Sequence, residues 1–465
     1  MHYVSTRGDA PPIDFLDAVL AGLAPDGGLY VPDAWPVLTG EEIAAFAGKP
    51  YAEVAADILG RFAGGAFSRD ELLEITSEAY AGFTHAAVTP LRQLNAGLWL
   101  LELFHGPTLA FKDVAMQMLA RLYERALAAK KRNLTIVCAT SGDTGGAAVE
   151  ALRGRANLRL VVLFPDGRIS EVQRRFMTTA SDKNVRCLAI DGTFDDCQSI
   201  VKALFQAQGF RQAVDLSGVN SINWARIAAQ VVYYFTAAVA LGAPHRPVSF
   251  AVPTGNFGDA FAGFVARQMG LPIEKIVVAT NSNDILARAI EEGRYARGPV
   301  CATQSPAMDI QIASNFERLY FEVVHREGLE TSRAMRAFAE TGAIDLPPKA
   351  LAQIRELFVG VGVDEADTTR AIVSTLNETG ELVDPHTAVA LAACYRLGLG
   401  KGRTPAVALS TAHAAKFPEA VQAAAGVAPA MPRSAQGLAG KPERIDRLPA
   451  DLEAVQAYIR RFAQD

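Results

Sequence analysis

The 465-residue chain has few cysteines and no pattern that would place them in disulfides or around a metal. Its cysteines form no C-x-x-C pair, and an odd number of widely spaced thiols is typical of a reduced, cytoplasmic protein. They are Cys138, Cys187, Cys197, Cys301 and Cys394. The chain contains no H-E-x-x-H motif, and none of its seven histidines lies within four residues of another. We therefore expect a cytoplasmic protein without a metal site.

Long apolar runs and strong charge are also scarce. No apolar run approaches the ~18 residues that would predict a membrane span. The opening residues MHYVSTRGDAPP lack the basic-then-apolar pattern of a signal peptide. The net charge is -5 without a basic stripe, so nucleic acid is not an expected partner. Because 50% of the residues are hydrophobic and 20% are charged, the sequence favours large buried cores over disorder.

The hydrophobic pattern changes twice along the chain. Residues 1–92 show helical periodicity broken by turn residues and predict a helical N-terminal domain. Residues 93–425 alternate short apolar strands with helices, which predicts mostly parallel sheets covered on both faces. Within this part, 342–380 resembles helix throughout, and 426–465 is a Pro/Gly-rich tail with a short final helix. The expected strands are 98–104, 134–140, 158–165, 185–191, 248–254, 275–281 and 406–411.

Lys112 follows an apolar shoulder, PTLAF, and precedes Asp113. A lysine in such a setting forms a Schiff base when desolvation or nearby charge holds its amine neutral. The alternative is a surface lysine that opens a helix, which is the usual role of this residue type.

A first glycine-rich turn, ATSGDTGGAA at 139–148, joins an expected strand to an expected helix. The first turn of a helix has free N–H groups and the positive end of the helix dipole, so it binds anions. The candidate ligand contacts are Ser141, Gly142, Asp143, Thr144 and Gly145. A plain strand-to-helix connection capped by Asp143 or Thr144 is the alternative.

A second turn, VPTGNFGDA at 252–260, has the same character. The residues around it are Gly255, Asn256, Phe257, Gly258 and Asp259. Neither turn matches G-x-G-x-x-G or G-x-x-x-x-G-K-[ST], so a dinucleotide or nucleoside-triphosphate site is not indicated.

Polar groups also crowd the start of an apolar helix in VNSINWARIAAQ at 219–230. Asn220, Ser221 and Arg226 would together supply amide, hydroxyl and guanidinium donors to a phosphate dianion. An ordinary Asn/Ser helix cap, with Arg226 on a solvated face, remains open. A lysine with one turn suited to a carboxylate and another suited to a phosphate is what a pyridoxal-phosphate (PLP) enzyme needs to handle an amino acid.

Several ordered motifs resemble one family, the longer form of threonine synthase. They are MHYVSTRG (1–8), DGGLYVP (26–32), HGPTLAFKDVA (105–115), TSGDTGG (140–146), PTGNFGD (253–259), SNFERLYFE (314–322) and DPHTAVA (384–390). The resemblance runs from residue 1 to about 420, and we find no such motif in the last forty residues.

The resemblance implies an α/β fold, the tryptophan-synthase β-like PLP fold type II. Two interleaved α/β domains, the smaller at roughly 112–214, would close over the cofactor beside the helical N-terminal domain. It also implies conversion of O-phospho-L-homoserine and water to L-threonine and phosphate, in a monomer or homodimer. Lys112 would be the Schiff-base lysine and the base for the Cα proton.

The resemblance also assigns the remaining residues. The 255–258 turn, with Asp259, would hold the cofactor phosphate, and the 141–145 loop would face the amino-acid end of the substrate. Asn220, Ser221 and Arg226 would bind the substrate phosphate. Thr411 would contact the pyridine nitrogen, because strand alternation points Ser410 the other way. Two alternatives stay open: a threonine-synthase-like phospho-lyase that yields 2-oxobutyrate, and another type II PLP lyase such as a serine/threonine dehydratase.

Overall fold

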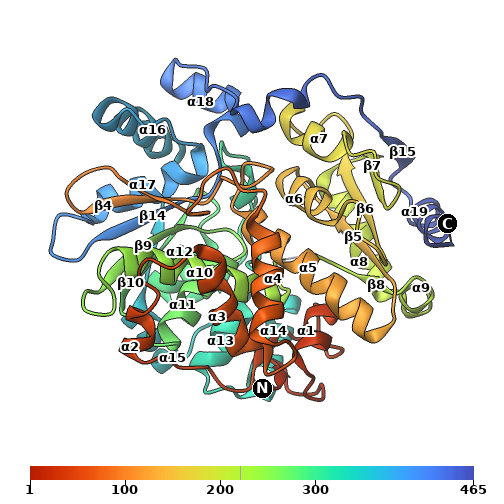
Figure 1. Ribbon diagram of the computed structural model, residues 1–465, viewed down its shortest axis with the longest axis horizontal. Helices are drawn as coiled ribbons and strands as arrows, with labels where there is room; N and C mark the ends of the chain where they lie inside the picture. Colours follow the sequence, from red (N-terminus) through yellow and green to blue (C-terminus); the bar gives the residue numbers. More distant parts are fainter. Residues whose placement is uncertain (220, 465) are drawn as a thin grey trace.

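The chain folds into a larger and a smaller lobe, and each lobe is built around one β-sheet (Figure 1). The structure is a computed structural model and describes residues 1–219 and 221–464. Buried side chains on both faces of each sheet contact helices, as the apolar strands require. The candidate functional residues come from strand ends and first helical turns where the lobes meet.

The larger sheet has six strands in the order β13-β10-β9-β14-β4-β3, all parallel except for β3 against β4. Alternate residues of one strand contact different helices: Leu409 of β14 joins the core of α10 and α11, whereas Ala408 joins that of α16 and α17. The strands are β3 (Leu91–Gln93), β4 (Leu98–Glu102), β9 (Val248–Pro253), β10 (Ile273–Thr280), β13 (Phe358–Gly362) and β14 (Ala406–Ser410). The helices named here are α10 (Trp224–Ala240), α11 (Gly258–Gln268), α16 (Glu365–Thr379) and α17 (Pro385–Leu397).

The chain between β10 and β13 forms a group of helices and one small antiparallel sheet, in which β11 pairs with β12. Among these helices, α15 packs on β10 and β13. The elements are α12 (Ile285–Glu292), β11 (Arg294–Ala296), η1 (Pro306–Met308), α13 (Phe316–Val323), α14 (Gly328–Thr341), β12 (Ala343–Asp345) and α15 (Pro348–Leu357).

The smaller sheet has five parallel strands in the order β15-β7-β6-β5-β8. Helices α5 and α6 cover one face, and α8, α9 and α19 cover the other. The strands are β5 (Leu134–Ala139), β6 (Leu158–Pro165), β7 (Val185–Asp191), β8 (Leu216–Ser217) and β15 (Asp446–Pro449). The helices are α5 (Lys112–Lys130), α6 (Asp143–Leu152), α7 (Glu171–Thr178), α8 (Phe194–Gln206), α9 (Gln208–Ala213) and α19 (Leu452–Gln464).

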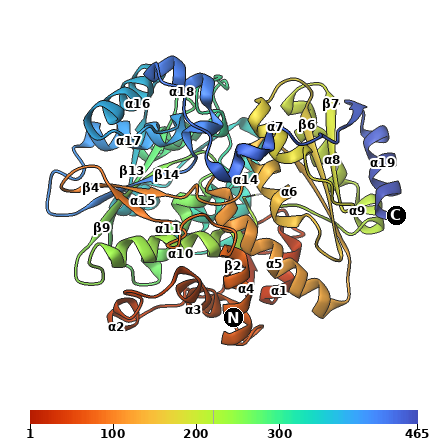
Figure 2. The ribbon, with the colours of Figure 1, turned by 45° about the horizontal axis from the view of Figure 1, so that its top comes forward.

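The N-terminal residues form a short β-ribbon and four helices that lie together below α5 and α10 in Figures 1 and 2. Their core is continuous with that of α5 and α10, since Trp224 of α10 contacts the rings of Tyr3, Trp35 and Phe62. The elements are β1 (Tyr3–Ser5), α1 (Phe15–Ala21), β2 (Tyr30–Pro32), α2 (Gly40–Ala44), α3 (Tyr51–Ala63) and α4 (Arg69–Tyr80).

The C-terminal residues run from the larger lobe back to the smaller one, as the blue ribbon shows in Figure 2. After β14 come η2 (Ala414–Lys416), α18 (Pro418–Ala425) and η3 (Arg433–Leu438). Arg174 of α7 binds Glu443 through its Nε and Nη2 at 2.8 and 3.0 Å, and β15 then pairs with β7. The tail therefore completes the smaller sheet, in addition to the short final helix that the sequence predicts.

The seven expected strands are all present, and their ends agree with the prediction to within two residues. The helical prediction for 342–380 was wrong in two places, where the structure contains β12 and β13. The sequence of β13 is FVGVG, and five residues are too few to separate a buried strand from the helices around it by periodicity. Within the described ranges, no helix has the length and apolar character needed to cross a membrane.

Candidate active site

Lys112 is the first residue of α5 and is fixed by the loop that precedes it. The Asp113 carboxylate accepts hydrogen bonds from the Thr108 N–H and hydroxyl, both at 2.7 Å. Burial raises the pKa of Asp113 to about 6. The Phe111 N–H donates to the Thr411 carbonyl at 2.8 Å. The start of α5 is thereby joined to the residue that follows β14.

The Lys112 side chain is only 12% exposed, so the surface-lysine alternative does not hold. Its Nζ lies 3.4 Å from Oδ2 of Asp143. Burial lowers the pKa of Lys112; Asp143 opposes this effect, whereas Lys416 and Arg226 add to it.

The first turn forms a compact loop between β5 and α6. The hydroxyl of Thr140 accepts the N–H groups of Gly142 and Gly145, each at 2.9 Å. Gly142 has φ 132°, and a Cβ there would lie 2.6 Å from Cδ of Gln173, so the position requires glycine. Ser141 is exposed and Thr144 is partly buried.

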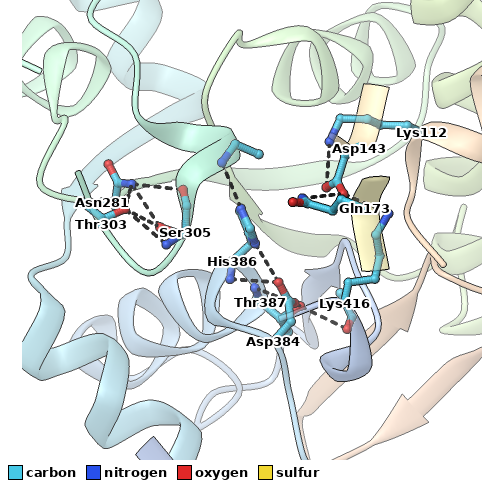
Figure 3. Close-up of polar contacts among 12 residues, drawn as sticks. Lys112, Asp143, Gln173, Asn281, Thr303, Ser305, Asp384, His386, Thr387 and Lys416 are labelled. Carbon is cyan, nitrogen blue, oxygen red and sulfur yellow. Dashed lines mark hydrogen bonds and ion pairs between the residues drawn. The ribbon is translucent and has the colours of Figure 1, made fainter. Parts of the chain in front are cut away.

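The Asp143 carboxylate lies among three donors (Figure 3). Lys416 Nζ is 2.8 Å from Oδ1, Gln173 Nε2 donates to the same oxygen at 3.1 Å, and Lys112 approaches Oδ2. Burial by itself would raise the pKa of Asp143, but Lys416 and then Lys112 outweigh it and hold this pKa well below its usual range. The sequence analysis identified neither Lys416 nor Gln173.

The second turn, between β9 and α11, packs closely against η1. A Cβ on Gly255 would lie 3.0 Å from the Ala307 carbonyl oxygen. Phe257 has φ 63°, and its ring contacts Phe316 and Phe358 in the core. The apolar side chain thus points inward, while the free N–H groups of the first turn of α11 follow directly. Asn256 is exposed and Gly258 is partly buried.

Asp259 has its carboxylate between α10 and α11. Oδ1 accepts the hydroxyls of Tyr233 at 2.5 Å and Tyr234 at 3.0 Å. Burial raises the pKa of Asp259 to about 6. The Asp259 side chain is therefore bound by α10, and only the main-chain atoms of this residue form part of the second turn.

The third group lies at the start of α10, although Asn220 is outside the described residues. Asn223 caps the helix, and its Oδ1 accepts the Ala225 N–H at 3.0 Å. Arg226 is only 3% exposed, which excludes the solvated-face alternative. Its Nη1 donates to the Val219 carbonyl at 2.9 Å, whereas its Nε has no partner among the described residues. Burial lowers the pKa of Arg226 to about 10.

The segment 314–322, to whose residues the sequence analysis gave no individual role, connects these loops. Asn315 Nδ2 donates to the carbonyls of Ser221 at 3.2 Å and Asn256 at 3.1 Å. Arg318 is fully buried and donates to the carbonyls of Tyr30 and Ile222. The segment therefore fixes the second turn relative to the start of α10 and attaches both to the N-terminal residues.

A second polar group surrounds His386 (Figure 3). Its Nδ1 is 2.7 Å from Asp384 Oδ2, and its Nε2 accepts the Ala307 N–H at 3.2 Å. Thr387 Oγ1 is 3.1 Å from the Ser410 hydroxyl. The Ser410 hydroxyl therefore has a partner in Thr387, and Thr411, the next residue, is 5% exposed.

His105 and His413, to which the sequence analysis gave no role, line a cavity of about 290 Å³ beside Leu109 and Ser410. His105 Nε2 is 2.7 Å from Glu102 Oε2. Burial lowers the pKa of His413. Within the described residues, no group of three or more His, Cys, Asp and Glu side chains could hold a metal ion.

These residues fit PLP. The chain has a buried lysine amine and a glycine turn that opens a helix, and the near contact of Gly255 with Ala307 leaves no room in that turn for a side chain. Arg226 adds a buried donor that the described protein atoms leave open. An anion is the ligand that such donors favour.

Comparison with known proteins agrees with this geometry. Three family models match: "Threonine synthase N terminus" at residues 2–80, "Pyridoxal-phosphate dependent enzyme" at 83–357 and "Threonine synthase, C-terminal" at 387–459. The last match includes most of the tail, where the sequence analysis found no family motif.

Individual relatives cover the whole chain. Threonine synthase of Pseudomonas aeruginosa is 48% identical over 460 residues, which is 99% of this chain and 98% of that protein. The crystal structure of PLP-bound threonine synthase from Brucella melitensis has a TM-score of 0.97 at 50% identity and covers 100% of both chains. Yeast threonine synthase has a TM-score of 0.93 at 36% identity, covering 100% of this chain and 99% of that one. The fold is PLP fold type II, and the chain belongs to the threonine synthase family of PLP-dependent enzymes.

Proposed function

We propose that this protein converts O-phospho-L-homoserine and water to L-threonine and inorganic phosphate. The observation that carries the proposal is the convergence of a buried lysine amine, a carboxylate-bearing loop and a buried guanidinium whose Nε has no partner in the part of the chain that the structure describes. Full-length similarity to threonine synthases supports the same reaction. When bound, PLP supplies the electron sink for carbanion chemistry at the amino acid.

Lys112 is the lysine to which the cofactor would attach. Its amine would also be the base for the Cα proton, because it would lie beside that carbon of the bound substrate. Burial lowers the pKa of Lys112, which favours the neutral amine that can accept this proton.

Three other groups would bind the cofactor and the amino-acid end of the substrate. The N–H groups of the turn formed by Gly255, Asn256, Phe257, Gly258 and Asp259 would bind the cofactor phosphate. The Thr411 hydroxyl would contact the pyridine nitrogen. The loop formed by Ser141, Gly142, Asp143, Thr144 and Gly145 would face the α-carboxylate.

Arg226 and Ser221, with Asn220, would hold the substrate phosphate. Negative charge grows on this group as its bond to Cγ breaks, so a fixed buried cation stabilises the transition state more than the ground state. This binding site for the substrate phosphate distinguishes the proposed enzyme from a serine/threonine dehydratase, whose substrate carries no phosphate.

The proposal is tested with purified protein and O-phospho-L-homoserine, with phosphate, threonine and 2-oxobutyrate measured in one sample. Equal amounts of phosphate and threonine are expected. Phosphate with 2-oxobutyrate would indicate the phospho-lyase, and no phosphate release would refute the proposal. Borohydride reduction followed by peptide mapping should place the cofactor on Lys112, and Lys112→Ala should abolish turnover. An adduct on another lysine would refute that assignment.

A further inference from the structure

Two buried lysines share one carboxylate at the candidate site (Figure 3). Lys416 Nζ lies 2.8 Å from Asp143 Oδ1, and Lys112 Nζ lies 3.4 Å from Oδ2. The Lys416 side chain is 1% exposed, that of Asp143 is 7% exposed and that of Lys112 is 12% exposed. One carboxylate compensates the charge of one ammonium, so the two lysines compete for it.

The geometry favours Lys416 in this competition. It has the shorter contact and is the more deeply buried of the two lysines. Each ammonium also faces an aromatic ring, Phe176 at 5.4 Å for Lys416 and Phe111 at 5.0 Å for Lys112, so the rings do not distinguish the two lysines. A buried ammonium without a counter-charge loses its proton more readily.

The other charges near Lys112 and Asp143 also favour a neutral Lys112 and a charged Asp143. Arg226 adds a further positive charge that lowers the pKa of Lys112, and burial is the largest cause of that lowering. His386 lowers the pKa of Asp143 in addition to the two lysines, and Lys416 also acts on the buried Asp113 carboxyl.

The chemistry requires this distribution of charge. An amine attaches to an aldehyde by adding its lone pair to the carbonyl carbon, and one water leaves; an ammonium has no lone pair and must lose its proton first. If Lys112 were the only cation beside Asp143, the ion pair would hold it as an ammonium. An uncompensated Asp143 would also repel an incoming α-carboxylate.

We propose that Lys416 is a positioning residue that occupies the Asp143 carboxylate, so that Asp143 neither captures Lys112 nor repels the carboxylate of the substrate. The inference rests on the proposed attachment of PLP to Lys112. Lys416 acts through Asp143 and needs no contact with the cofactor. It comes from η2, three residues beyond His413, whereas Asp143 opens α6, so the ion pair also joins the two lobes.

The test is the pH dependence of cofactor attachment to full-length protein freed of PLP. The rate at which added PLP gains its protein-bound visible absorbance should rise with pH as Lys112 loses its proton. In Lys416→Met, the midpoint should move to higher pH by about one unit or more, the size expected for a changed charge at this distance. The kcat/KM profile should move the same way, with activity recovering in alkaline buffer. Lys416→Arg keeps the charge and should retain the wild-type midpoint.

Asp143→Asn tests whether the effect passes through the carboxylate. In this background, the change Lys416→Met should move the midpoint less than it does in the wild type. The exposed Lys401→Met is the matched control and should change neither profile. An unmoved midpoint in Lys416→Met, or an undiminished movement in the Asp143→Asn background, would overturn the inference. A lower melting temperature with equally slow attachment at every pH would show a structural role and also overturn it. If wild-type protein fails to attach PLP at Lys112, the proposed function itself fails, which is a separate outcome.

Discussion

Replacing Arg226 by methionine should lower the activity of this protein without lowering its thermal stability. The guanidinium is 3% exposed, and among the described residues its Nε lacks a partner and no carboxylate forms an ion pair with it. A buried ion replaced by an apolar side chain of similar volume is often neutral or stabilising. Among the described residues, the substitution gives up one hydrogen bond, from Nη1 to the Val219 carbonyl. We therefore expect the ligand-free Arg226→Met variant to melt at or above the wild-type temperature.

The activity should change in the opposite direction. A hydrogen bond to a charged group contributes about 1.5–3 kcal/mol, which corresponds to a loss of about 10- to 150-fold in kcat/KM for O-phospho-L-homoserine. The loss should appear in kcat as well as KM if the contact strengthens as phosphate departs. Arg226→Lys should recover only part of it, because an ammonium lacks the two-pronged geometry of guanidinium.

Two measurements on the same preparations check this reasoning. Steady-state kinetics give kcat and KM, while melting curves with and without inorganic phosphate report ligand binding through the shift in melting temperature. Phosphate should stabilise wild-type protein more than Arg226→Met. An unchanged kcat/KM would remove Arg226 from the site, and loss of PLP absorbance or a large fall in melting temperature would show that the residue is structural.

Two further predictions concern the second turn. In Gly255→Val, the new Cβ meets the Ala307 carbonyl at 3.0 Å, so the affinity for PLP should fall by about tenfold or more; Gly402→Val, where a Cβ meets nothing within 4 Å, is the control in the same spectrophotometric titration. Equal PLP affinity in the two variants would place the phosphate site elsewhere. The pKa of Asp259 rises from 3.8 to about 6 on folding because of burial, so the folded state binds more protons than the unfolded state between these values. Its contribution to the free energy of unfolding should therefore decline as pH increases from about 4 to 6, and Asp259→Asn should remove this decline in urea titrations; an unchanged pH dependence would contradict the assignment.

The strands of both sheets could be predicted largely because they are buried on both faces. Such strands are continuous apolar runs, and β6 and β7 match their predicted bounds. Strand β15, with the sequence DRLP, is polar and lies at a sheet edge, so nothing in its own composition marks it. Its pairing depends on β7, which is far away in the sequence.

The residues of the candidate site also differ in whether the local sequence reveals their role. Lys112 and the two turns have local signatures, since glycine and a strand-to-helix change fix the backbone there. Lys416 has none, because a lysine in AAKF differs from a surface lysine only through the carboxylate that α6 brings to it. Asn315 and Arg318 likewise have no local signature of their role, and only the fold shows that their partners are main-chain carbonyls of distant loops.

The position of β15 and α19 also bears on how the protein is made. The ribosome releases β5, β6 and β7 early, yet the edge of β7 is paired by a strand that emerges after the entire larger sheet. Until then, the apolar side chains that Val455, Ile459 and Phe462 of α19 will cover remain open on the nascent smaller lobe. A growing chain with an unpaired strand edge and an uncovered apolar face is prone to aggregate. Production of this protein therefore depends on how quickly its last residues follow the rest.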